Sequence, residues 1–210
     1  MNQIPKLIDE WINVHRVYTK AYSGDPAWLF SLQERKHELK QVAIRVSQLA
    51  ARGKLLDIGT GPGYLPIEIA KKCPNLNITG VDTELKLLKD AITNAGKNRL
   101  SERINCIRAQ AEYLPFADCC FDTITSTYSF HLWNEQQQGA KEIYRILKPG
   151  GTAMLLVGRR FLLRGWQYFT DWFTNGTIST IRSYCVNAGF KEQDIKIKSM
   201  PMVLQIIVTK

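Results

Sequence analysis

From residue 54 onward, short apolar runs alternate with segments that carry apolar residues at helical spacing. The short apolar runs predict buried strands over 54–58, 77–81, 104–108, 121–126 and 152–157. Helical spacing covers 64–72, 84–95 and 136–147. Strands that alternate with helices are joined by right-handed crossovers into a parallel sheet. The chain is therefore predicted to be an α/β protein with a doubly wound, mostly parallel sheet.

The two ends of the chain depart from this alternation. After a helix over 178–188, strands are expected over 194–198 and 203–208, and the link between them is too short for a crossover helix. They should form an antiparallel hairpin, which gives seven strands with an antiparallel last strand. Residues 1–53 read as helical, with a long helix after Asp25-Pro26. We expect an N-terminal helical segment over 1–53 and an α/β domain over 54–210.

Composition excludes several classes of protein. With 210 residues, 45% of them hydrophobic, the chain can bury the core of one globular domain. Its longest clean apolar stretch, 153–157, is far shorter than the roughly 20 residues of a membrane-spanning helix. The N-terminus has no apolar core of a signal peptide, so we expect a cytoplasmic location. The five cysteines include no Cys-x-x-Cys pair, and no metal site is expected.

The net charge of +9 lies mainly in the two flanks of the chain. A basic flank can attract nucleic acid, a phosphate-bearing substrate or an anionic membrane surface. However, no block of five like charges and no recognised nucleic-acid-binding module is present. A nucleic-acid partner is therefore disfavoured.

A glycine-rich turn, Asp57-Ile-Gly59-Thr-Gly61-Pro-Gly63, follows the first strand and opens a helix. Such a turn places backbone N–H groups and a helix N-terminus beneath a ligand. By itself it fits a dinucleotide site, an S-adenosylmethionine site or a plain tight turn.

Spacing separates these three alternatives. The dinucleotide pattern needs a glycine where Tyr64 or Pro66 stands. Asp57 would repel a pyrophosphate but suits a ligand that carries an ammonium and a sulfonium. Asp82 ends the second strand, at the separation where an acid binds a ribose diol.

Five motifs in this order resemble the class I S-adenosylmethionine-dependent methyltransferases, in particular the branch with ubiquinone, menaquinone and small-molecule enzymes. They are Leu55-Leu-Asp-Ile-Gly-Thr-Gly-Pro-Gly63, Gly80-Val-Asp82, Ala111-Glu-Tyr-Leu-Pro-Phe116, Phe121-Asp122 and Arg145-Ile-Leu-Lys-Pro-Gly-Gly151. The resemblance implies a Rossmann-like domain over 54–210 and S-adenosylmethionine as the cofactor. We expect the N-terminal helices over 1–53 to form a lid.

Carried over by residue, the resemblance places Gly59, Gly61 and Gly63 under the methionine part, with Asp57 towards its amino group. Asp82 would hold the ribose hydroxyls. The adenine would be lined by Thr83, by Ala111 and by Gln110, which stands where the family usually has an acid. Ser126 would flank the sulfonium.

Tyr128 and His131 follow the fourth strand, near where the methyl acceptor should lie. We expect these two residues to act in catalysis, His131 as a general base; the alternative is that the histidine simply packs or caps. The family motifs for amino-group and cytosine-C5 methylation are absent after this strand, where Ser126-Thr-Tyr-Ser129 stands instead.

The segment 159–177 is expected to form a cap over the acceptor. It holds aromatic residues together with Arg159, Arg160 and Arg164, which suits an aromatic or apolar small molecule with an acidic group. The alternative is a helix that packs its aromatic side chains on the sheet. An RNA or protein methyltransferase and a non-catalytic S-adenosylmethionine-binding protein remain the alternative functions.

Overall fold

The structure is a computed structural model that describes residues 36–50, 52–158, 178–199 and 203–210. Contacts between residues divide the chain into two compact units, Met1–Val42 and Ala43–Lys210. Most of the expected lid over 1–53 and the whole expected cap over 159–177 lie outside the described residues. Both therefore stay predictions.

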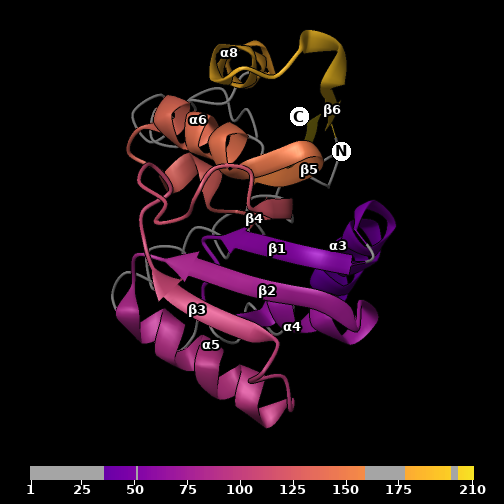
Figure 1. The fold of residues 1–210 in the computed structure, drawn as a ribbon, viewed down its shortest axis with the longest axis vertical. Coiled ribbons are helices and arrows are strands. Elements are labelled where there is room, and N and C mark those ends of the chain that lie inside the picture. The colour runs from indigo at the N-terminus through magenta and orange to yellow at the C-terminus, as the bar shows by residue number, and fades with distance from the viewer. Residues whose placement is uncertain (1–35, 51, 159–177, 200–202) are drawn as a thin grey trace, which may run out of the picture. The chain divides into compact units, whose positions relative to one another are not determined.

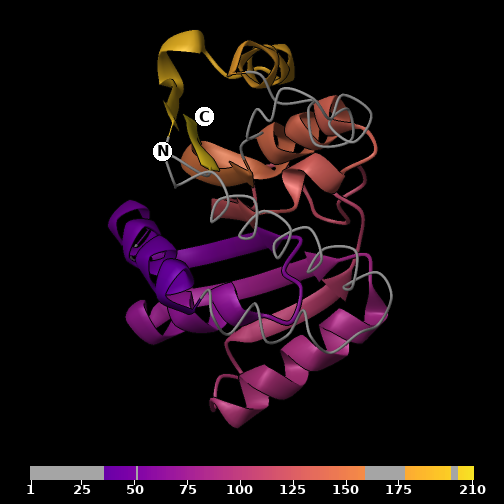
Figure 2. The ribbon, with the colours of Figure 1, turned by 180° about the vertical axis from the view of Figure 1, so that it is seen from behind.

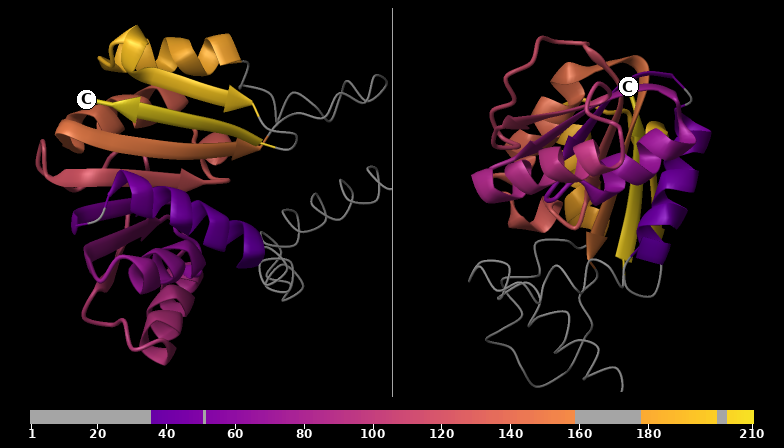
Figure 3. Two further views of the ribbon diagram at one scale, coloured as in Figure 1. Left: turned by 90° about the vertical axis from the view of Figure 1, so that its right-hand side faces the viewer. Right: turned by 90° about the horizontal axis from the view of Figure 1, so that it is seen from below.

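A seven-stranded sheet forms the centre of the second unit, in the order β3-β2-β1-β4-β5-β7-β6 (Figure 1). The strands are β1 (Arg52–Ile58), β2 (Asn75–Asp82), β3 (Ile104–Arg108), β4 (Phe121–Thr127), β5 (Leu147–Gly158), β6 (Ile195–Ser199) and β7 (Val203–Thr209). The described antiparallel pairings all involve β7, which lies between β5 and β6. The left view of Figure 3 shows β7 running against both neighbours. The predicted parallel sheet with its antiparallel last strand is confirmed.

Among the described residues, α4 (Tyr64–Lys72), α5 (Leu85–Lys97) and α6 (Gln136–Ile146) connect parallel strands, whereas α3 (Lys36–Leu49) precedes β1. The other described helices are α8 (Ile178–Ala188) and the short 3₁₀ helices η1 (Phe130–Leu132) and η3 (Glu192–Asp194). Figures 1 and 2 show α5 alongside β3 from both sides. The crossovers through α4 and α5 run outward from β1, whereas the one through α6 runs the other way from β4. Right-handed crossovers therefore place α6 on the opposite face from α4 and α5.

Apolar side chains of the central strands form the core. Leu55 and Leu56 on β1, Ile124 on β4 and Met154 on β5 are fully buried. Adjacent residues of a strand point to opposite faces, so the burial of both Leu55 and Leu56 means that both faces of β1 are covered. This packing fixes the strand ends at which the candidate site is built. No helix among the described residues is long and apolar enough to span a bilayer.

The start of β5 differs from the sequence prediction. We expected this strand to start at Thr152, but β5 begins at Leu147 and includes the Lys-Pro-Gly-Gly segment. Leu147 pairs with Phe121, and the register then shifts before Thr152 pairs with Thr123. Gly150 N–H also donates to the carbonyl of Lys210 (2.7 Å). These partners are distant in sequence, so local turn propensity could not reveal them.

Candidate functional site

The strand order reverses between β1 and β4, since β1 leads on to β2 and β4 leads to β5 on the other side. In open α/β sheets, ligands bind outside the carboxyl ends of the strands at such a point. Asp57, Asp82 and Ser126 lie at or near the carboxyl ends of β1, β2 and β4. The fold thus brings these predicted site residues to one edge of the sheet.

The loop from Gly59 to Gly63 is tied to the end of β2 by its own backbone. The N–H groups of Gly59 and Thr60 both donate to the carbonyl of Val81, at 2.8 and 2.9 Å. The next N–H, of Gly61, donates to Oδ2 of Asp82 at 2.9 Å. Adjacent strand ends therefore hold the loop in one conformation.

Each of the three loop glycines has a left-handed backbone, with φ of 74° at Gly59, 53° at Gly61 and 76° at Gly63. A β-carbon at Gly59 would collide with Ser129, and one at Gly63 would lie 3.0 Å from the β-carbon of Ala91. At Gly61, by contrast, a β-carbon would meet no atom of the described residues within 4 Å. Packing explains two of the glycines, and of the three only Gly61 faces space that the described residues leave open.

Asp82 joins the loop to the start of the next helix. Its Oδ2 accepts from Gly61 N–H, and its Oδ1 accepts from Glu84 N–H at 3.0 Å. A carboxylate offers about four lone-pair sites, so each oxygen can still accept one more hydrogen bond. Partial burial raises the pKa of Asp82, and the backbone N–H bonds offset part of that rise. The remaining acceptor capacity is what a pair of hydroxyl groups would need.

Asp57 is 1% exposed, directly before the glycine loop. Its Oδ1 accepts a hydrogen bond from the Thr125 hydroxyl at 2.7 Å. Burial raises the pKa of Asp57 to about 7, although the hydrogen bond from Thr125 acts to lower it, and the nearby Asp82 carboxylate adds to the rise. A cation placed beside Asp57 would restore its charge and lower this pKa.

Among the residues that the structure describes, no basic side chain forms an ion pair with Asp57 or Asp82. Two partly or wholly buried acids that interact unfavourably with each other lie beneath a loop with one open glycine. The arrangement favours a ligand that carries a positive charge and hydroxyl groups, and it disfavours a pyrophosphate. The described residues contain no cluster of three or more metal-ligating side chains.

Ser126 lies beneath the loop and not at its open side. It is fully buried, and its Oγ lies 2.7 Å from the Oγ of Ser129. Ser129 in turn donates to the carbonyl of Ile58 at 2.9 Å. This chain of hydrogen bonds connects the end of β4 to the end of β1. The geometry gives Ser126 a supporting position under the glycine loop.

Tyr128 and His131 follow β4, in the turn that leads into η1. Tyr128 has a left-handed φ of 55°, which is uncommon for a residue with a bulky side chain, and its N–H donates to the carbonyl of Leu156 at 2.9 Å. Burial lowers the pKa of His131 to about 4. His131 is therefore neutral at pH 7, but its conjugate acid is too strong for the well-matched general base that the sequence suggested.

The loop after β3 meets the end of β2. Ala109 N–H donates to the carbonyl of Asp82 at 3.1 Å, and Gln110 and Ala111 follow directly. Gln110 is exposed, whereas Ala111 is buried. The exposed Thr83 adjoins them, since its carbonyl accepts from Arg108 Nε at 3.0 Å. The three residues predicted to line an adenine are thus near the Asp82 carboxylate.

Sequence reasoning missed the residues that hold the site in shape. Thr125 binds Asp57, and Ser129 both packs against Gly59 and bonds the carbonyl of Ile58. Both side chains come from β4 and its following turn, about 70 residues away from their partners. No local pattern signals such pairs. Only the placement of Ser129 directly after the fourth strand hinted at a position near the site.

The motif Phe121-Asp122 has a structural role at the opposite edge of the sheet from the candidate site. Asp122 of Phe121-Asp122 accepts from Lys54 N–H at 2.8 Å and from Lys148 Nζ at 2.7 Å, near the amino ends of β1 and β4. Burial acts to raise the pKa of Asp122, but these hydrogen bonds outweigh it and lower the pKa. Asp122 therefore fastens the start of β4 to β1 and β5.

Comparisons with known proteins point to one family. Residues 56–155 match the family described as Methyltransferase domain. The chain is 35% identical over 118 residues to the ubiquinone/menaquinone biosynthesis C-methyltransferase UbiE of Geotalea daltonii, covering 56% of this chain and 50% of that protein. It is 29% identical over 143 residues to a demethylmenaquinone methyltransferase of Porphyromonas gingivalis, covering 68% of this chain and 58% of that protein. The chain thus spans about half the length of these relatives.

Another relative matches over most of its length. The uncharacterized methyltransferase YdaC of Bacillus subtilis is 27% identical over 171 residues, which cover 81% of this chain and 90% of that protein. No acceptor is implied by its name.

Solved structures share the fold. A SAM-dependent methyltransferase from Aquifex aeolicus aligns with a TM-score of 0.70 at 16% identity, covering 88% of this chain and 97% of that chain. Phosphoethanolamine N-methyltransferase 2 of Haemonchus contortus, in complex with phosphomonomethylethanolamine and S-adenosylhomocysteine, aligns with a TM-score of 0.66 at 22% identity. That alignment covers 76% of this chain and 38% of the other. The family match, the ordered motifs and the fold agree that residues 56–155 form a methyltransferase domain with the fold of the class I S-adenosylmethionine-dependent methyltransferases.

Proposed function

We propose that this chain binds S-adenosylmethionine at the glycine loop and transfers its methyl group to a small-molecule acceptor. The observation that carries the proposal is the pair of acids, Asp57 and Asp82, beneath a loop in which Gly61 alone faces space left open by the described part of the chain. A ligand with an ammonium, a sulfonium and a ribose diol satisfies both acids, whereas a dinucleotide would bring a pyrophosphate against them.

In this proposal the loop residues Gly59, Gly61 and Gly63 pass beneath the methionine part of the cofactor, and Asp57 binds its amino group. Asp82 accepts hydrogen bonds from the two ribose hydroxyls through the acceptor sites that the backbone leaves open. The Gln110 amide binds the adenine, since its oxygen can accept from N6 and its nitrogen can donate to N1. Thr83 and Ala111 line the ring.

Methyl transfer from a sulfonium is an in-line displacement. When bound, the cofactor would supply the methyl group: the acceptor atom would bond to the methyl carbon as the carbon–sulfur bond breaks, sulfur would keep that electron pair, and the proton that the acceptor loses would pass to water. Much of the acceleration comes from holding the two reactants in line. We assign that positioning to Tyr128 and His131, with the neutral imidazole of His131 accepting a hydrogen bond from the acceptor. Ser126 holds the floor of the site through Ser129.

The acceptor that we propose is an aromatic or apolar small molecule of the hydroquinone type. Two relatives carry quinone-biosynthesis names, and a third is named 2-methyl-6-phytyl-1,4-hydroquinone methyltransferase 1 (Oryza sativa), 32% identical over 165 residues. The aromatic residues and arginines of 159–177 support a cap over such a ring and over an acidic group. The cytoplasmic location stays a prediction.

A matched pair of variants tests the cofactor site. Asp82→Asn and Asp122→Asn each replace a carboxylate that accepts backbone N–H hydrogen bonds by an uncharged amide, but only Asp82 belongs to the proposed site. Calorimetric titration with S-adenosylhomocysteine should show affinity reduced at least tenfold in Asp82→Asn and nearly unchanged in Asp122→Asn. Equal losses in the two variants would mean that the effect is one of stability and would contradict the assignment of Asp82. Transfer of labelled methyl from S-adenosylmethionine to a hydroquinone tests the acceptor separately.

A further inference from the structure

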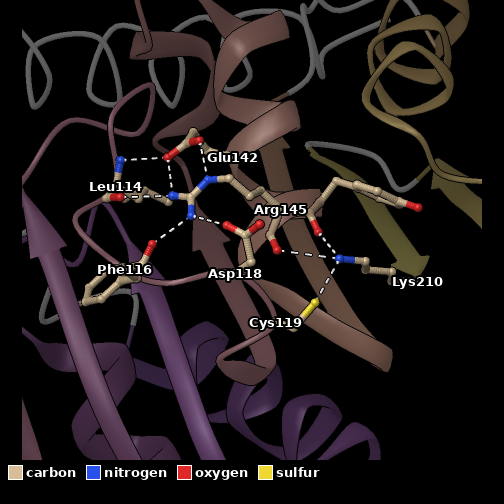
Figure 4. A network of polar contacts seen from close by, with 8 residues as sticks. Leu114, Phe116, Asp118, Cys119, Glu142, Arg145 and Lys210 are labelled. Atoms are coloured by element: carbon tan, nitrogen blue, oxygen red, sulfur yellow. Dashed lines mark hydrogen bonds and ion pairs between the residues drawn. The ribbon is translucent and has the colours of Figure 1, made fainter.

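The loop between β3 and β4 is bound to α6 by one acidic and one basic side chain. Arg145, in the last turn of α6, donates from Nε and Nη2 to the two carboxylate oxygens of Glu142, both at 2.8 Å (Figure 4). The same guanidinium donates to the carbonyls of Leu114 at 3.0 Å and Phe116 at 2.7 Å, and to Asp118 at 2.8 Å. Every described hydrogen bond of this guanidinium except those to Glu142 goes to the loop.

Glu142 completes the attachment by binding the same loop. Its Oε2 accepts from Leu114 N–H at 2.8 Å, so both backbone groups of Leu114 are bound by the Glu142–Arg145 pair. The Glu142 side chain is 11% exposed, whereas that of Asp118 is 73% exposed. The bidentate pair with Glu142 is therefore shielded from water, and the bond to Asp118 contributes little.

The attached backbone lies directly after the residues proposed to bind the adenine. Gln110 and Tyr113 form an isolated antiparallel bridge, and Tyr113 N–H donates to the carbonyl of Gln110 at 3.2 Å. Leu114 follows this tight turn at once. Upstream, Ala109 is bound to the end of β2. Gln110 is thus fixed between β2 on one side and the Glu142–Arg145 pair on the other.

We propose that Glu142 and Arg145 are positioning residues for cofactor binding, because they set the place of Gln110 without touching the ligand themselves. This inference rests on the proposed function. A purely structural role would lower stability and leave the affinity of the folded protein for the cofactor unchanged. A positioning role predicts weaker cofactor binding through Gln110 specifically.

The test measures the affinity for S-adenosylhomocysteine in Arg145→Lys, well below the unfolding temperature. Lysine keeps the charge but lacks the planar fork that binds Glu142 and two carbonyls together. The matched control is Arg103→Lys, since Arg103 also joins backbone carbonyls, those of Ala70, Cys73 and Leu76, but at the far end of α4. We expect at least a tenfold loss of affinity in Arg145→Lys and less than a twofold loss in Arg103→Lys.

A double-mutant cycle with Gln110→Ala measures the coupling between the two residues in cofactor affinity, which a purely structural role of Arg145 would not produce. If Arg145 acts through Gln110, then Gln110→Ala should reduce affinity much less in the Arg145→Lys background than in the wild type. In the Arg103→Lys background the effect of Gln110→Ala should be unchanged. Glu142→Gln, a milder change to the same pair, serves in place of Arg145→Lys if that variant does not fold.

The outcomes separate the two proposals. Binding by the wild type together with unchanged affinity in folded Arg145→Lys, or with fully additive effects in the cycle, would overturn the positioning role alone. A wild type that fails to bind S-adenosylhomocysteine would overturn the proposed function and this inference with it.

Discussion

Asp57 is a buried carboxylate whose ionisation opposes folding. Its folded pKa of about 7 lies above its ordinary value of 3.8, so the folded state holds the proton more tightly between those two pH values. The resulting stability is present at low pH and is lost as the pH rises through about 7. Asp57→Asn removes the charge, and its advantage over the wild type should grow by about 2–3 kcal/mol from pH 5 to pH 8, at about 1.4 kcal/mol per pKa unit.

Denaturant unfolding of both proteins at pH 5 and pH 8 measures this difference. Asp122→Asn is the control, because the pKa of Asp122 is lowered and its charge stabilises the fold. Since Asp122 is ionised in both states above its unfolded pKa, Asp122→Asn should be destabilised by the same amount at pH 5 and at pH 8. We expect Asp57→Asn to bind S-adenosylhomocysteine more weakly at pH 8, despite its greater relative stability there. A stability difference that does not change with pH would show that Asp57 is not the buried, unpaired carboxylate described above.

At the scale of single elements, alanine variants at Gly61, in the β1–α4 loop, and at Gly150 distinguish the cost of backbone strain from the loss of contact with the ligand. Gly61 and Gly150 both have left-handed backbones, with φ of 53° and 76°, and a β-carbon at either position would meet nothing within 4 Å among the residues that the structure describes. Alanine should therefore cost each of them about 1–2 kcal/mol of stability. Only Gly61 faces the proposed cofactor.

Thermal unfolding and titration with S-adenosylhomocysteine check this prediction together. We expect similar, modest falls in melting temperature for Gly61→Ala and Gly150→Ala, and a loss of binding in Gly61→Ala alone. Full affinity in Gly61→Ala would mean that the open space beside this glycine is not where the cofactor lies.

For the whole molecule, the sequence predicted the strand and helix order because both signals are local. Apolar runs and helical spacing located six of the seven strands to within about two residues, and the short link before Val203 correctly indicated the hairpin. The predicted start of β5 was wrong by five residues, because Leu147 pairs with Phe121 and no local sequence pattern reveals that pairing.

The same distinction applies to the site. Asp57, Asp82 and the glycines were recognisable because their spacing along the chain is regular. The roles of Thr125 and Ser129 were not recognisable, because each binds a residue about 70 positions away. The same holds for the Glu142–Arg145 pair, because its role depends on Leu114, which lies 28 positions before Glu142. The low pKa of His131 likewise results from burial in the folded chain, which its neighbours in sequence do not determine.

The central claim is that the edge of the sheet at Asp57 and Asp82 is an S-adenosylmethionine site. Calorimetric titration of the wild-type chain with S-adenosylhomocysteine, beside a titration with NAD, tests it most directly. We predict saturable binding of S-adenosylhomocysteine with a micromolar dissociation constant, and no binding of NAD. Binding of NAD without binding of S-adenosylhomocysteine, or binding of neither, would contradict the claim.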